Sequence, residues 1–123
     1  FSPPAEAAWM GWYAAAQGYS GFLRWAHDSW VQDPLRDTSY VTWPAGDCFL
    51  TYPGPRSSIR FERLREGIQA YEKVRLLRER LGEDTLGELG EALAEFTYEN
   101  VLKTPAAETI ARANAALDRA SRE

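Results

Sequence analysis

Apolar side chains recur three or four positions apart in residues 57–81, which places them on one face of a helix. This apolar face consists of Phe61, Leu64, Ile68, Tyr71, Val74, Leu77 and Leu81. Ser57 or Ser58 can cap the first turn, and Gly82 follows the last one. The pattern therefore predicts an amphipathic helix over residues 57–81.

The N-terminal residues predict a second helix. Ser2 followed by Pro3 fits an N-cap with proline at the first helical position. The apolar positions that follow at helical spacing are Trp9, Trp12, Tyr13 and Ala16. Gly18 is suited to end this helix in a left-handed conformation.

Two short apolar segments between these helices predict extended structure. Gly21–Ala26 is bounded by turn residues and is expected to be a strand, and Cys48–Pro53 is a second extended piece. Residues 28–47 form a long loop, a kind of segment that often carries function. A helix that leads into a strand through a short loop is half of a βαβ unit. We therefore expect a helix-rich α/β fold.

The C-terminal residues predict a helical hairpin. Thr85 and Glu88 have the spacing of a capping box, and Thr104-Pro105 begins a last helix. The two apolar faces are Leu86, Leu89, Leu93 and Phe96, then Ile110, Ala113, Leu117 and Ala120. The predicted organisation is an aromatic segment over residues 1–82 and a helical extension over residues 83–123.

Composition and charge narrow the partners of this 123-residue chain. Its net charge is −4 and it has no Lys/Arg-rich run, so we expect no nucleic-acid partner. An acidic surface and the lack of an 18-residue apolar stretch argue against a membrane partner. The segment FSPPAEAAWM lacks the pattern of a signal peptide, and the compartment stays open.

Arginines in the first half need partners. On a strand, Arg24 shares a face with Phe22 and Ala26, opposite Leu23, Trp25 and His27. An unpaired buried guanidinium is costly, so Arg24 is expected to meet a carboxylate. The candidates are Asp28, Asp33, Asp47 and Glu62. Arg60 lies in a first helical turn, where a cation is unfavourable, so we pair it with Asp47 or with a ligand.

All five tryptophans lie in the first 43 residues, interleaved with acids. Flat indole faces stack on the apolar side of a sugar ring, and carboxylates accept bonds from sugar hydroxyls. The residues that fit this description are Trp25, Trp30, Trp43 and Tyr52, with Asp33, Asp37 and Asp47. They predict a carbohydrate pocket. The alternative is that the tryptophans only wedge the loop onto the body of the protein.

The remaining reactive side chains predict no cofactor and no metal. His27 is the only histidine, so a histidine-based zinc site is not expected, and a loop-ordering hydrogen bond is its predicted role. Cys48 has no partner for an internal disulfide and is expected to be a small buried residue. The pair Glu83-Asp84 lies at a helix start, where acids favour the helix dipole.

Four segments in order resemble the C-terminal part of glycoside hydrolase family 123, also described as domain of unknown function 4091. They are GFLRWAHDSW, DPLRDT, WPAGDCFLTYPGP and SSIRFERLREGIQAYEKVRLL, within residues 5–82. The resemblance implies a (β/α)8 barrel, of which this chain is the C-terminal piece. Residues 3–17 then resemble the seventh barrel helix, Gly21–Ala26 the eighth strand and residues 57–81 the eighth helix.

The resemblance also implies a substrate and a mechanism. Such enzymes cleave terminal β-linked N-acetylgalactosamine, and the sugar's own 2-acetamido group attacks the anomeric carbon. An aspartate orients that group and an adjacent glutamate is the general acid, but they lie on an earlier strand, and this chain contains no Asp-Glu dipeptide. By resemblance, Trp25 encloses the acetamido group or stacks on the ring, below the loop residues Trp30, Trp43 and Asp47.

The predicted substrate-binding residues are Trp25, Trp30, Trp43, Asp47, Arg24 and Arg60. No catalytic residue is expected within the chain, so the chain alone is expected to be inactive. Two other functions stay open, a non-catalytic carbohydrate-binding module and a protein-interaction domain. One strand cannot close a sheet, so we also expect self-association or pairing with the remainder of a barrel.

Overall fold

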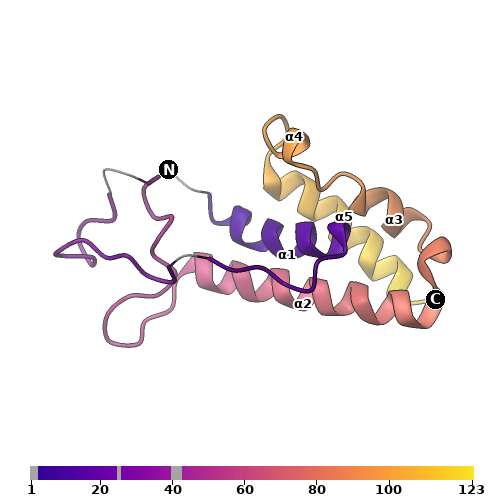
Figure 1. Cartoon of the computed structure of the whole chain (residues 1–123), viewed down its shortest axis with the longest axis horizontal. Coiled ribbons are helices and arrows are strands. Elements are labelled where there is room, and N and C mark those ends of the chain that lie inside the picture. Colours follow the sequence, from indigo (N-terminus) through magenta and orange to yellow (C-terminus); the bar gives the residue numbers. More distant parts are fainter. Residues whose placement is uncertain (1–2, 25, 40–42) are drawn as a thin grey trace.

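The computed structural model describes residues 3–24, 26–39 and 43–123. They form a helical body and one long irregular segment, which lies between α1 and α2 in residues 18–58. Two main helices, α1 (Ala5–Gln17) and α2 (Ile59–Leu81), run side by side, and α5 (Ala106–Ser121) packs against α1 (Figure 1). The shorter elements are η1 (Glu83–Thr85), α3 (Glu88–Leu93) and α4 (Tyr98–Val101). The helix-rich class is thereby confirmed.

The ends of α1 and α2 follow mainly from local chemistry. Gly18 ends α1 with φ at 70°, as predicted, and its N–H caps the last turn. Ser58 caps α2, because its hydroxyl accepts a bond from the Phe61 N–H at 3.1 Å. The predicted start of α1 is wrong. Pro4 occupies the N-cap position with no side-chain cap, and Ser2 lies outside the described residues.

The buried face of α2 agrees with the predicted apolar face only at Val74 and Leu77. Its buried residues are Gly67, Ala70, Val74 and Leu77, whereas Ile68 is 48% exposed. The reason is the close crossing of α1 and α2, where Gly11 lies directly against Gly67. Small side chains allow that approach, and Phe61, Leu64 and Tyr71 beside the crossing are only partly buried.

The predicted strand at Gly21–Ala26 forms no ladder among the described residues, since Gly21–Arg24 and Ala26 have no β-partner. Cys48–Pro53 likewise folds into turns, with two isolated antiparallel bridges, Asp28 with Phe49 and Tyr52 with Arg56. A strand needs neighbouring strands for its hydrogen bonds, and the described chain offers only these bridges. Figure 1 shows the segment after Gly18 running back along α2 to the end at which α2 begins.

The C-terminal residues form three helices rather than a simple hairpin. The predicted capping box is wrong, because α3 begins after Gly87 without a side-chain cap. The unpredicted α4 is capped by Thr97, whose hydroxyl accepts from the Asn100 N–H at 3.1 Å. The last helix begins at Ala106, close to its predicted start.

One hydrophobic core joins the two predicted parts of the chain, residues 1–82 and residues 83–123. Trp12 from α1 is 1% exposed and stacks on Phe96, with ring centroids 5.4 Å apart. Val74 of α2, Leu89 of α3 and Ala113 of α5 are fully buried in the same cluster. Among the described residues, no helix combines the length and apolar character needed to cross a bilayer.

Candidate functional site

The irregular segment is anchored by an ion pair between Arg24 and Asp47. The Arg24 Nη2 atom lies 3.2 Å from the Asp47 Oδ1 atom and donates to the Asp47 carbonyl at 3.3 Å. Both side chains are about one quarter exposed, at 23% and 27%. Of the four partners predicted for Arg24, the structure therefore selects Asp47.

Arg60, at the start of α2, covers the turn that carries Asp47. A Cβ atom on Gly46 would lie only 2.5 Å from the Cζ, Nη1 and Nη2 atoms of Arg60, so the guanidinium rests directly on this glycine. Gly46 has φ at 86°, a conformation that disfavours any other residue. Arg60 therefore contacts the turn that contains Asp47, whereas its pairing with Asp47 or with a ligand stays a prediction.

Arg24, Asp47 and Arg60 line one cavity of about 330 Å³ between the loop and the helices α1, α2 and α4. Its other walls are mainly apolar and come from the start of α1, from α4 and the residue after it, and from Leu50 of the loop. They comprise Pro3, Glu6, Ala7, Trp9, Met10, Leu50, Tyr98, Val101 and Leu102. The three charged residues predicted for the site are therefore brought together, on the side of the extended segment that faces the helices.

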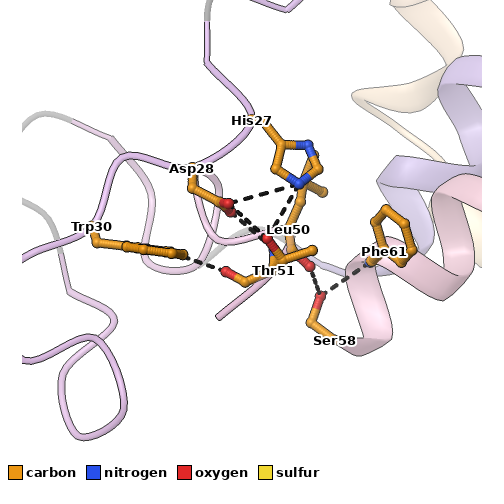
Figure 2. A network of polar contacts seen from close by, with 7 residues as sticks. All are labelled: His27, Asp28, Trp30, Leu50, Thr51, Ser58 and Phe61. Carbon is orange, nitrogen blue, oxygen red and sulfur yellow. Dashed lines mark hydrogen bonds and ion pairs between the residues drawn. The ribbon is translucent and has the colours of Figure 1, made fainter. Parts of the chain in front are cut away.

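Trp30 belongs to a second cluster, built around Thr51 (Figure 2). Its indole Nε1–H donates to the Thr51 carbonyl at 2.9 Å. Asp28 accepts two bonds from the same residue, from the Thr51 N–H at 2.9 Å and from its hydroxyl at 2.6 Å. Asp28 and Thr51 were not predicted as site residues. They lie 23 positions apart, and no sequence pattern indicates a contact over that separation.

His27 has the loop-ordering role predicted from the sequence. Its Nε2 atom lies 3.3 Å from the Thr51 hydroxyl and 3.7 Å from an Asp28 carboxylate oxygen. The ring also meets Phe61 edge-on, with centroids 6.1 Å apart. The side chain is 53% exposed, so these contacts hold a surface residue in place.

Only some of the aromatic residues predicted to stack on a sugar have accessible rings in the structure. Trp30 and Trp43 are 42% and 40% exposed, which keeps ring surface accessible. Tyr52 instead packs against the buried Phe49, with ring centroids 5.9 Å apart. Trp25 lies outside the described residues.

The other predicted acids are engaged locally. Asp33 lies 3.8 Å from Arg36. Asp37 accepts bonds from the hydroxyl and N–H of Ser39, and these bonds lower the pKa of Asp37 below its ordinary value. Both acids therefore serve the local geometry of the loop in this structure.

Cys48 is buried, as predicted, at 1% exposure. Burial raises the pKa of its thiol, and the neighbouring Asp47 carboxylate adds to the rise. Among residues 3–24, 26–39 and 43–123, no group of three or more histidine, cysteine or acidic side chains is arranged to hold a metal ion.

Comparison with known proteins identifies the family. The model of the glycoside hydrolase 123 catalytic domain matches residues 1–77, which include α1, the irregular segment and most of α2. No curated protein matches the chain. Since the match covers more than half of the sequence and includes both residue clusters described above, the chain belongs to glycoside hydrolase family 123.

Proposed function

We propose that the chain is the closing part of a (β/α)8 catalytic domain that removes terminal β-linked N-acetylgalactosamine from glycans. In this proposal α1 is the seventh barrel helix, Gly21–Ala26 the eighth strand and α2 the eighth helix. The observation that carries it is the match of residues 1–77 to the catalytic domain of the family. Residues 83–123 are then a helical extension that covers the outer side of α1.

The arrangement of the extended segment supports this assignment. Phe22 lines a cavity of about 400 Å³ with Leu64 and Ile68 of α2, whereas the side chain of Leu23 is 90% exposed. A barrel strand meets helices on one face and the barrel interior on the other. Leu23 would therefore point toward the missing strands, and sequence alternation assigns Trp25 to the same face.

The substrate-binding residues then divide into two roles. Arg24, Asp47 and Arg60 hold the loop after the eighth strand from the side that faces the helices. Trp30 and Trp43 present ring surface on that loop, above a pocket in which Trp25 would enclose the acetamido group. The loop follows the carboxyl end of the strand, where barrel enzymes build their active sites.

The chemistry proposed for the whole domain is substrate-assisted. The 2-acetamido oxygen attacks the anomeric carbon while a glutamic acid protonates the departing glycosidic oxygen, and water later opens the cyclic intermediate. The Asp-Glu pair for these steps is absent from this sequence. This chain therefore contributes substrate binding, and the acid pair would come from an earlier strand.

The test is hydrolysis of 4-nitrophenyl N-acetyl-β-galactosaminide by the intact protein that carries this chain. We expect turnover, and Trp25→Ala should lower kcat/KM by at least about tenfold. Trp12→Phe is the matched control, since Trp12 is buried in the helical core and stacks on Phe96, at 5.4 Å between ring centroids. An intact protein without turnover, or an unchanged kcat/KM in Trp25→Ala, refutes the proposal.

The same proposal predicts what covers the open face of the extended segment. Leu23 and Phe22 are 90% and 41% exposed in the chain, and exposed apolar groups favour association. We propose that the remainder of the barrel covers them in the intact protein and that the chain alone self-associates. Light scattering should show a mass above 13.9 kDa for the chain and a reduced mass for Leu23→Lys.

A further inference from the structure

The indole of Trp30 is held by one edge while part of its ring surface stays exposed. The Nε1–H donates to the Thr51 carbonyl at 2.9 Å, and the side chain remains 42% exposed. A ring whose N–H is satisfied by the protein can offer a face to a ligand without losing that bond. Stacking on a sugar requires such a face in a fixed orientation.

The residue whose carbonyl holds Trp30 is itself fixed by Asp28. Both Asp28 oxygens accept from Thr51, at 2.9 Å from its N–H and 2.6 Å from its hydroxyl. The Asp28 side chain is only 17% exposed, and the residue forms a backbone bridge with the buried Phe49. The peptide unit that contains the Thr51 carbonyl is held on its other side by the Tyr52 N–H, which donates to the Arg56 carbonyl at 3.0 Å. Asp28 thus fixes the N–H and side chain of Thr51, next to the carbonyl that accepts from Trp30.

The cluster is tied to the first turn of α2. The Ser58 hydroxyl donates to the carbonyl of Leu50 at 2.6 Å and accepts from the Phe61 N–H at 3.1 Å. Figure 2 shows this series of contacts leading from Trp30 through Thr51 and Leu50 to the helix. The loop tryptophan is thus supported by a helix of 23 residues.

We infer that Asp28 and Thr51 are positioning residues that set Trp30 as a stacking platform for a pyranose ring. The inference rests on the proposed function and assigns roles to two residues outside the predicted set. Neither residue touches the sugar in this scheme. Their effect is to keep the indole in one orientation, so that binding does not have to order it.

The first experiment needs no ligand. In ¹⁵N-labelled chain, Trp30→Phe identifies the Trp30 indole N–H signal by its disappearance. Asp28→Ala should shift that signal and speed its exchange with solvent by about tenfold, because the Thr51 carbonyl is released. Thr51→Val should have a smaller effect, and Thr51→Ser, which keeps the hydroxyl, should match the parent chain. An unmoved signal in Asp28→Ala refutes the positioning role.

The second experiment measures hydrolysis of the aryl N-acetyl-β-galactosaminide by the intact protein. Trp30→Ala and Asp28→Ala should each raise KM about five- to tenfold, with kcat within about twofold. If Asp28 acts through Trp30, the double variant should be no worse than Trp30→Ala alone. Thr51→Ser should restore what Thr51→Val loses.

The outcomes separate the two proposals. An intact protein that hydrolyses nothing refutes the proposed function, whatever the indole signal shows. An active protein in which Trp30→Ala leaves KM unchanged refutes the platform alone. Additive effects of Asp28→Ala and Trp30→Ala, or a fall confined to kcat, also refute it, because Asp28 would then act independently of the indole.

Discussion

Gly67 of α2 lies directly on the backbone of Ala8 in α1, so that a Cβ atom on Gly67 would come within 2.6 Å of the Ala8 carbonyl oxygen. The obstacle is backbone, which cannot move aside as the end of a flexible side chain can. This contact sets how closely α1 and α2 approach. It thereby brings the first turns of both helices near each other, and these turns line the cavity that contains Arg24, Asp47 and Arg60.

Gly67→Ala should destabilise the chain by about 3 kcal/mol, because the added methyl forces the two helices apart. The measurement is denaturant unfolding followed by circular dichroism. Gly90→Ala is the matched control in α3, where the new Cβ would lie 3.6 Å from the Leu86 Cβ. That substitution should stabilise by about 0.5 kcal/mol through helix propensity. Equal effects at the two glycines would contradict the close crossing.

The Arg24–Asp47 ion pair should show a coupling of about 1 kcal/mol in a double-mutant cycle with Arg24→Met and Asp47→Asn. Partial burial protects the pair from screening, so the coupling should survive moderate salt. The exposed pair Arg36–Asp33, at 3.8 Å, is the control and should show a coupling near zero. A zero coupling for Arg24 and Asp47 would mean that the ion pair does not anchor the loop.

Ser58→Ala should cost about 1–2 kcal/mol, because it removes the α2 cap and the bond to the Leu50 carbonyl. Amide hydrogen exchange should quicken in the first turn of α2 and around Thr51. Ser57→Ala, next to it, removes only a bond to the exposed Glu62 and should change stability by less than about 0.5 kcal/mol. The same loss in both variants would argue against the specific role of Ser58.

Cys48 should react with thiol reagents only when the structure opens. Burial raises the pKa of its thiol, so the reactive thiolate is scarce near neutral pH. Labelling should be slow in the native chain and fast in denaturant, and Ser58→Ala should accelerate native labelling. Rapid labelling of the native chain, at the rate of a free thiol, would contradict the burial of Cys48.

The Glu88–Arg119 pair predicts a loss of stability in acid. Arg119 donates to both Glu88 oxygens, at 2.8 Å and 2.5 Å, and these bonds hold the pKa of Glu88 below its ordinary value of 4.5. The Glu88 carboxylate therefore binds a proton less readily in the folded state than in the unfolded state. The resulting stability is present above pH 4.5 and disappears as pH falls through the lowered pKa. A carboxyl-carbon NMR titration should show the lowered pKa, and Arg119→Met should return it to the ordinary range.

The sequence predicted the structural features that depend on neighbouring residues along the chain. The periodicity of apolar residues located α2 within two residues of its start, Gly18 was identified as a cap, and the α2 cap was narrowed to Ser57 or Ser58, of which the structure selects Ser58. Motifs in residues 5–82 also indicated the family, which the match over residues 1–77 confirms.

The predicted site was only partly accessible from sequence. Asp47 was one of four possible partners of Arg24, and its selection required the fold of the intervening loop. Trp30 was recognised as an aromatic loop residue, but its support by Thr51 and Asp28 was not, because no local pattern marks those contacts.

The sequence by itself determined that the regions of α1, α2 and α5 are helical, that α1 ends at Gly18 and α2 at Gly82, and which family the chain belongs to. The tertiary structure decided which face of α2 is buried, which acid holds Arg24 and how Trp30 is supported. Helix periodicity and caps arise from residues within one or two turns, so they can be seen in the linear chain. The crossing at Gly67 and the bonds to Thr51 join distant segments, and their geometry exists only once the chain has folded.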